Sequence, residues 1–220
     1  MGNGIEHIVS LYNASWYGWT LLLLGICAVL SEVFQPGVMT GITGTVFARS
    51  ERMYKRTPDN FPGQLSSTIF QIGTLALMLV MIWRDRFDSA ANGIALYGIA
   101  AAMIVAVLLV KTALNGLIDY TFQLKASAEV STHMAGITML VCLGLYAAAL
   151  VLPLAHSVVV NRWVAGALGI VYLALTTYRM VLVFMSGAKS ILYILMYVMT
   201  LEVLPIGVLV AGISQMMQII

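Results

Sequence analysis

Charged residues are spaced so far apart in this sequence that several uncharged stretches are long enough to cross a lipid bilayer. No Asp, Glu, Lys or Arg occurs between Glu6 and Glu32, or between Asp59 and Arg84. A spanning helix needs about 20 predominantly apolar residues, whereas a spanning β-strand needs about ten residues of alternating hydropathy. Backbone hydrogen bonds must all be made internally in lipid, so these stretches predict transmembrane helices.

The composition excludes other classes of protein. Of the 220 residues, 61% are hydrophobic and 9% are charged. Soluble domains carry about 25% charged residues, so an ordinary water-soluble globule is ruled out. The net charge of +2 and the lack of a long basic run exclude a nucleic-acid-binding protein.

The predicted fold is all-α, a polytopic transmembrane helical bundle of about six spans within a single integral membrane domain, residues 1–220. The predicted spans cover residues 12–30, 65–83, 92–110, 134–154, 163–184 and 190–214. A basic cytoplasmic loop at 31–64 follows the first span, and an interfacial amphipathic segment at 115–130 precedes the fourth.

The distribution of basic residues predicts an orientation. With both termini on the non-cytoplasmic side, eight of the 11 Lys and Arg residues fall inside: Arg49, Arg52, Lys55, Arg56, Lys111, Lys125, Arg179 and Lys189. This excess satisfies the positive-inside rule. The same topology places all four tryptophans near outer span ends, where interfacial tryptophan is enriched: Trp16, Trp19, Trp83 and Trp163.

Two smaller groups of residues favour packing roles. Cys27 and Cys142 lie inside apolar runs, where a thiol usually acts as a small buried hydrophobe. Small residues suited to close helix contacts recur in the later spans: Gly136, Gly144, Gly166, Gly169, Gly207 and Ala211.

Glu202 is the clearest polar residue inside a predicted span. It lies about 16 Å from the cytoplasmic end of the last span, and Arg179, its expected partner, lies about 8 Å from the same side in the fifth span. A bare carboxylate at that depth is costly, so Glu202 must be protonated, paired or hydrated. Pro205 removes a backbone donor in the same span and favours a kink. The predicted site also includes nearby hydroxyl groups: Tyr178, Tyr193 and Tyr197.

Two interpretations of this intramembrane site remain open. Glu202, Arg179 and the tyrosines form a buried proton or ligand site, or the ion pair only fixes how the last two spans pack. The second is favoured, because one acid and one base without further polar residues rarely make a transport pathway.

No cofactor, metal site or enzymatic activity is predicted. The sequence lacks the motifs of zinc proteases, P-loop enzymes and α/β-hydrolases. His133 and His156 flank the fourth span about 35 Å apart, so they cannot ligate opposite faces of one haem.

A combination of residues in the C-terminal half resembles a known family. Tyr178-Arg179 ends one span, Leu201-Glu202-Val203-Leu204-Pro205 lies in the next, Glu129 precedes the fourth span and Pro153 lies near its end. The pattern over residues 95–215 is similar to a family of uncharacterised polytopic inner-membrane proteins of Bacteroidetes with a Leu-Glu-x-Leu-Pro motif in the last helix. His133-Met134 stand where that family has an Asn-Lys pair. The resemblance implies a multi-pass fold, an inner-membrane location and importance for Glu202, Arg179 and Pro205, but no activity.

These features favour an integral protein of the bacterial inner membrane that is a non-catalytic subunit or an assembly or accessory factor of a cell-envelope complex. Expected partners are the bilayer, other membrane subunits or a second copy of the chain. The basic loop is expected to meet an anionic lipid or a cytoplasmic partner through Arg49, Arg52, Lys55 and Arg56. A small proton-coupled transporter or channel centred on Glu202 is the alternative, and a haem- or quinone-associated protein is a weaker one.

Overall fold

The computed structural model describes residues 15–35, 61–83, 93–122, 127–151, 158–185 and Gly207. Within these ranges the chain is helical and contains no strand, which confirms the predicted all-helical class. The helices are α2 (Ser15–Phe34), α4 (Phe61–Trp83), α5 (Gly93–Phe122), α6 (Ser127–Val151) and α7 (Val158–Met185).

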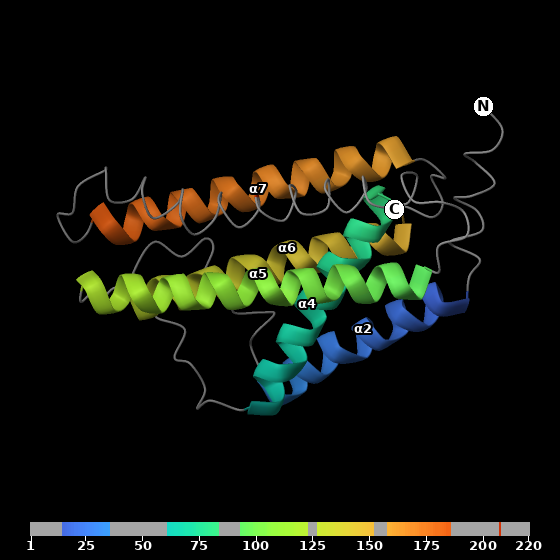
Figure 1. The fold of residues 1–220 in the computed structure, drawn as a ribbon, viewed down its shortest axis with the longest axis horizontal. Coiled ribbons are helices and arrows are strands. Elements are labelled where there is room, and N and C mark those ends of the chain that lie inside the picture. Colours follow the sequence, from blue (N-terminus) through green and yellow to red (C-terminus); the bar gives the residue numbers. More distant parts are fainter. Residues whose placement is uncertain are drawn as a thin grey trace.

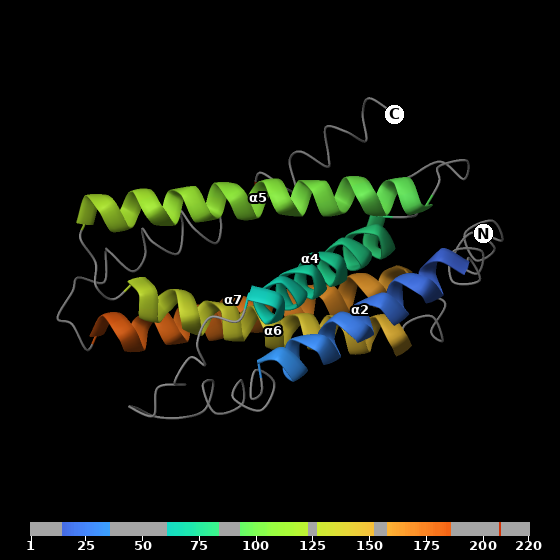
Figure 2. The same cartoon turned by 90° about the horizontal axis from the view of Figure 1, so that it is seen from below.

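Consecutive helices run in opposite directions along the bundle. Helices α2, α5 and α7 begin at the end where α4 and α6 finish (Figures 1 and 2). This alternation is the arrangement that an up-and-down membrane bundle requires. The predicted sixth span, 190–214, lies outside the described residues apart from Gly207. The total number of spans and the side of each terminus therefore stay predictions.

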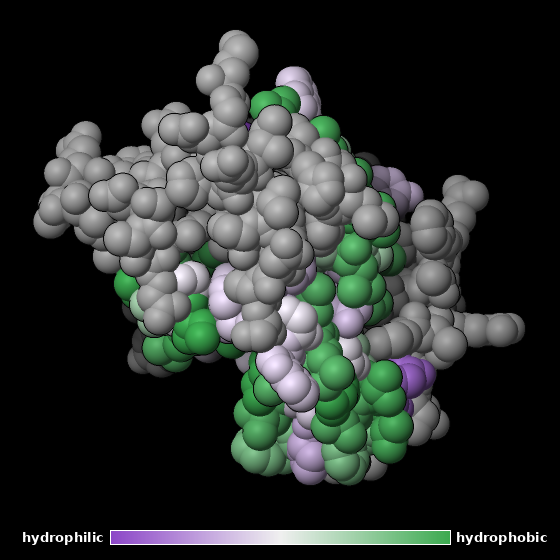
Figure 3. All heavy atoms as spheres, turned by 90° about the vertical axis from the view of Figure 1, so that its right-hand side faces the viewer, coloured by the Kyte–Doolittle hydropathy of each residue, from purple (hydrophilic) through white to green (hydrophobic). Residues whose placement is uncertain are grey.

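Three helices are long and apolar enough to cross a membrane: Trp16–Phe34, Phe61–Ile82 and Gly93–Leu114. They overlap the first three predicted spans. The described part of α6 adds a shorter apolar helix, Gly136–Val151. Large apolar side chains are exposed on α2, α5 and α7, among them Leu23, Val29, Ile94, Leu109 and Ile170. Figure 3 shows apolar residues over much of the described surface at one end of the molecule. A surface of this kind is suited to lipid and not to water.

Helices α2 and α4 extend into both ends of the loop predicted at 31–64, and prolines lie at the two helix boundaries. Helix α2 continues to Phe34 and stops just before Pro36, because proline disfavours a helical conformation at the residue that precedes it. Helix α4 begins at Phe61, and Pro62 lies in its first turn, where a missing backbone N–H costs nothing.

Helix α5 extends well past the third predicted span. It continues through Lys111 to Phe122, so residues 115–122 of the predicted interfacial segment are its last two turns, and 127–130 begin α6. The half-buried Lys111 ends the uncharged stretch without ending the helix, because a lysine can lay its apolar stem along a helix while its ammonium group reaches the interface. Helix α7 likewise begins before its predicted span, at Val158.

Helix α4 occupies the centre of the bundle. It packs against α2, α5, α6 and α7, and α6 packs against α7. Figure 1 shows α4 crossing obliquely between the other helices. Within the candidate spans, 44% of the residues of α4 are buried, against 22% for α2 and 17% for α5. The fully buried side chains Phe70, Leu77 and Leu24 lie in this core.

Close approaches between helices depend on glycines that the sequence did not single out. A Cβ atom at Gly73 of α4 would overlap the side chain of Leu24 and lie 2.9 Å from the hydroxyl oxygen of Tyr97. A Cβ atom at Gly25 of α2 would lie 2.7 Å from the hydroxyl oxygen of Tyr146. Small residues allow such close backbone approaches in membranes.

The glycines expected at helix contacts differ in whether another helix lies close to them. A Cβ atom at Gly144 would lie 3.3 Å from Leu168 of α7, so this expectation is confirmed. Among the described residues, a Cβ atom at Gly166 or Gly169 meets nothing within 4 Å, so neither glycine makes a close contact in this part of the bundle. The expectation for Gly207 stays a prediction, because the rest of its span lies outside the described residues. Helix periodicity did not show which face of α7 points outward.

Candidate intramembrane polar site

Most residues of the site predicted around Glu202 lie outside the described part of the chain. This holds for Glu202, Tyr193, Tyr197 and Pro205, and for the basic loop residues Arg49, Arg52, Lys55 and Arg56. The backbone of Arg179 continues α7, but its side chain is not among those described. Tyr178 is 57% exposed, so its ring lies on the surface of the described bundle. The proposed Glu202–Arg179 pair stays a prediction.

A polar stripe on the central helix is the main interior feature that sequence reasoning missed. Ser67, Gln71 and Thr74 of α4 recur at the spacing that places side chains on one helix face. Contacts from Ser67 and Gln71 to α6 show that this face points into the bundle. Polar side chains in membrane helices favour such interfaces, because lipid offers them no hydrogen-bond partner.

Two sulfur atoms of α6 meet this stripe. The amide Nε2 of Gln71 donates to Ser67 Oγ at 3.3 Å and to Met139 Sδ at 3.9 Å. Ser67 Oγ also donates to Met139 Sδ, at 3.8 Å. The thiol of Cys142 points at the backbone carbonyl oxygen of Gln71 at 4.0 Å. Cys142 is fully buried, as the sequence predicted, and Cys27 is only partly buried.

Two fully buried threonines differ from three threonines that are partly or largely exposed. Thr20, Thr68 and Thr112 each donate a hydroxyl hydrogen bond to the carbonyl oxygen one turn earlier, at 2.8–2.9 Å. The hydroxyl groups of Thr74 and Thr176 are fully buried and have no hydrogen-bond partner within the described ranges. A buried hydroxyl group without a partner is destabilising, so each marks a place where a hydrogen-bonding group is missing.

Side chains from neighbouring helices satisfy carbonyl groups at one end of the bundle. The last four carbonyls of a helix have no partner within that helix. Tyr17 of α2 donates its hydroxyl group to the carbonyl oxygen of Ala149, in the last turn of α6, at 2.6 Å. Arg162 of α7 donates Nε to the carbonyl oxygen of Ile82, in the last turn of α4, at 3.3 Å. These contacts tie the ends of α4 and α6 to the starts of their neighbours.

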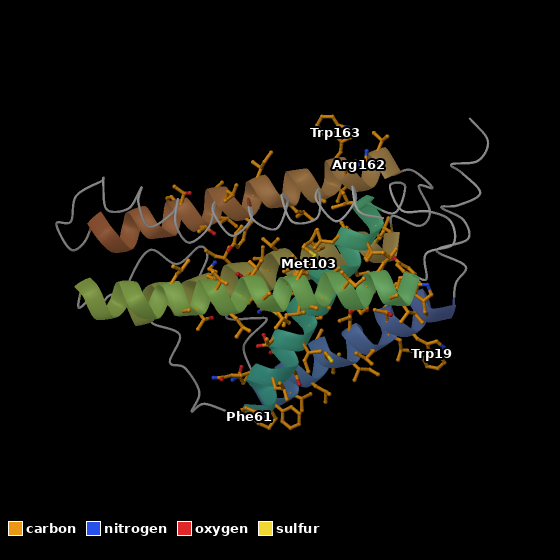
Figure 4. All side chains as sticks on the ribbon, in the orientation of Figure 1. Trp19, Phe61, Met103, Arg162 and Trp163 are labelled. Carbon is orange, nitrogen blue, oxygen red and sulfur yellow. The ribbon has the colours of Figure 1, made fainter. Side chains whose placement is uncertain are left out.

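Tryptophans gather at this same end. Figure 4 places Trp19 on α2 and Trp163 beside Arg162 near the start of α7, whereas Phe61 lies at the start of α4. Trp163 is 76% exposed, whereas Trp16 packs on Tyr97 with ring centroids 6.3 Å apart. Tryptophan side chains near the ends of membrane helices are typical of a membrane interface.

The side chains that meet at the contact between α4 and α6 are neutral: the hydroxyl group of Ser67, the carboxamide of Gln71, the thioether of Met139 and the thiol of Cys142. No group of three or more His, Cys, Asp or Glu residues able to hold a metal ion occurs among the described side chains. The arrangement can fix helix packing by hydrogen bonds and can bind a small neutral group at its unpaired hydroxyl groups. A signal for it existed, since polar residues at helical spacing in an apolar span predict one polar face.

Comparison with known proteins yields one family. Residues 11–213 match the family described as "Domain of unknown function (DUF4271)". No curated protein and no solved structure shows significant similarity to the chain.

Proposed function

The chain belongs to the DUF4271 family. From its apolar helical bundle we propose that it is an integral protein of the bacterial inner membrane. We propose further that it is a non-catalytic subunit, or an assembly or accessory factor, of a cell-envelope complex. The proposal rests mainly on the outer face of α5. In the described bundle, α5 packs chiefly against α4, and its opposite face carries small residues at helical spacing: Ala95, Gly98, Ala102 and Ala106. Such a face lets another membrane helix approach closely.

The rest of the bundle supports a packing role. The central helix is held by hydrogen bonds to α6 and α7, and its neighbours are tied to one another by Tyr17 and Tyr146. Bonds between helices of this kind produce a well-defined scaffold, which a subunit needs more than a transporter with moving parts does.

Site-specific photocrosslinking tests the proposed partner. A photoreactive residue at Ala102, on the exposed face of α5, should give a discrete heavier product in native membranes. The matched control is Ile170, which is 70% exposed on α7 and outside that small-residue face. A product that contains a different membrane protein supports a subunit, and a product that contains only a second copy supports a homo-oligomer. The absence of any product at Ala102 in intact membranes contradicts the proposal.

A proton-coupled transporter or channel centred on Glu202 is the second candidate. The observation that favours it is the register of α7: Leu168, Tyr172 and Leu175 pack against the core, and Thr176 is fully buried. The position of Arg179 continues this inward face by helical spacing. In proteoliposomes, Glu202→Gln should abolish dye-detected proton flux and leave folding intact if Glu202 carries protons. Lack of flux in the parent protein, with a lower melting temperature for Glu202→Gln, supports a structural pair.

The orientation is part of the proposal and has its own test. Single cysteines at Ser50 and Ser89, on a background without Cys27 and Cys142, should react with an impermeant thiol reagent from opposite sides of the membrane. Labelling of both from one side contradicts a span between them, and labelling of Ser50 from outside contradicts the side assigned to the basic loop.

A further inference from the structure

We propose that the contact between α4 and α6 contains a buried site for water, bounded by the hydroxyl group of Thr74, the thiol of Cys142 and the backbone carbonyl oxygen of Gln71. Nothing in the family description assigns a ligand to this part of the bundle. The site is neutral, so it takes a small neutral molecule that both donates and accepts hydrogen bonds. Water is the smallest such molecule, and the groups that would bind it lie deep in the bundle, since Thr74 and Cys142 are both fully buried.

The unpaired hydroxyl group of Thr74 is the first observation. A helical threonine can satisfy its hydroxyl group on a carbonyl one turn earlier, as Thr20, Thr68 and Thr112 do. Thr74 has two such carbonyls within its turn, at Phe70 and Gln71, and bonds to neither. Its hydroxyl group therefore points to a partner other than its own helix.

The geometry at Gln71 is the second observation. The thiol of Cys142 lies 4.0 Å from the carbonyl oxygen of Gln71, which is the outer limit for a bond from sulfur. That carbonyl precedes Thr74 by less than one helical turn, and helical spacing places Thr74 on the same face of α4 as Gln71. A buried water typically makes about three hydrogen bonds, the number that these groups provide. The water accepts from the thiol, donates to the carbonyl oxygen and pairs with Thr74.

A polar route leads to this point from one end of the bundle. Gln64, Ser67 and Gln71 lie half-buried along the same side of α4, and Thr74 lies about 15 Å beyond Gln64 at 1.5 Å per residue. Beyond Thr74 the same face carries only buried Met78 and Met81. Water therefore enters from the end where α4 begins and stops near the middle of the membrane. This makes a half-membrane hydration track that is closed toward the tryptophan end.

Exchange of the Cys142 thiol proton tests this site directly. The chain has 2 cysteines, so Cys27→Ala leaves Cys142 as the single source of the S–H infrared band. In lipid nanodiscs transferred to D2O, that band should convert to S–D within minutes, since water reaches the thiol. A band that persists for hours, as long as the slowest amides of the spans, overturns the proposal.

Threonine variants on the same background separate a hydrated site from a dry one. Thr74→Val should slow the exchange by about tenfold and lower the Tm by about 2–4 °C, because it removes a partner of the bound water. Thr74→Ser keeps the hydroxyl group and should retain fast exchange. Thr112→Val, at an exposed threonine of α5 bonded to Leu108, should change neither quantity.

A rise in the Tm of Thr74→Val, in place of a fall, contradicts the proposal. If the hydroxyl group of Thr74 is dry, Thr74→Val removes an unsatisfied polar group, raises the Tm and leaves exchange unchanged. If Thr74→Val does not fold, exchange in the Cys27→Ala parent and in Thr74→Ser still decides between the two outcomes.

Discussion

Helices α4 and α5 are both long and apolar, yet they take opposite positions in the bundle. Among residues of their candidate spans, 44% are buried in α4 and 17% in α5. The buried helix is the one that carries Ser67, Gln71 and Thr74, and α5 exposes Ile94, Leu109 and other large apolar side chains. In a soluble protein the more apolar helix would be the one at the centre. Lipid reverses that order, because polar groups find partners only inside the bundle.

Alanine substitutions at Phe70 in α4 and Ile99 in α5 should give the largest difference in the loss of folding stability. Phe70 is fully buried and packs edge-on against Tyr146, whereas Ile99 is 42% exposed. Phe70→Ala should destabilise the fold by about 3–5 kcal/mol, and Ile99→Ala by less than about 1 kcal/mol. Thermal unfolding in detergent measures both. Equal losses would mean that α5 is as central as α4.

An arginine on the outer face of α5 tests whether that face lies within the membrane. Ala102 is exposed near the middle of the span, and Ala102→Arg should cost about 2.5–3.5 kcal/mol in membrane insertion. Ala113→Arg, next to the end of the candidate span at Leu114, should cost much less, because its side chain can reach the interface. An insertion assay that scores both variants as wild type would show that this face meets water.

Leucine substitutions at Gly73 in α4 and Gly98 in α5 should give a smaller difference in folding stability. Gly73→Leu should destabilise the fold by about 1–3 kcal/mol, because its side chain must displace Leu24 and Tyr97. A Cβ atom at Gly98 of α5 meets nothing within 4 Å, so Gly98→Leu should leave the melting temperature unchanged. Should Gly98→Leu also remove the Ala102 crosslink, the outer face of α5 would be confirmed as the partner surface.

A substitution in the polar stripe of α4 should lower the folding stability only slightly. Gln71→Leu removes the bonds to Ser67 and Met139, and hydrogen bonds between membrane helices contribute about 0.6 kcal/mol on average. Thr112→Val on α5 is the control and should be neutral, since its bond stays within one helix. A loss near 3 kcal/mol for Gln71→Leu would mean that the stripe holds the core together.

A double-mutant cycle extends these comparisons to the predicted pair. Glu202→Gln and Arg179→Gln should show a coupling on the order of 1 kcal/mol in thermal stability if the two side chains touch. Additive effects of the two substitutions would show that Glu202 and Arg179 do not interact.

Part of the candidate site was predictable and part was not. The burial of Cys142 was predictable from its apolar neighbours. Ser67, Gln71 and Thr74 were not predicted as a polar face, because they carry no charge and do not stand out in an apolar span. An uncharged polar residue in a span is inexpensive enough to occur on any face, so only its spacing hints at a shared interface. The glycines show the same limit: Gly166 and Gly169 are open, and Gly73 and Gly25 make the close contacts.

The sequence by itself determined the solvent and the class of fold. Charge spacing and the need to satisfy backbone hydrogen bonds act along one segment at a time, so they predict helices that cross lipid without knowledge of their neighbours. Only the tertiary structure decided that α4 is central, that its polar face meets α6 and that the outer face of α5 is open. The physical reason is that lipid is as apolar as a packed helix surface, so hydrophobicity alone does not distinguish the inside of a membrane bundle from its outside.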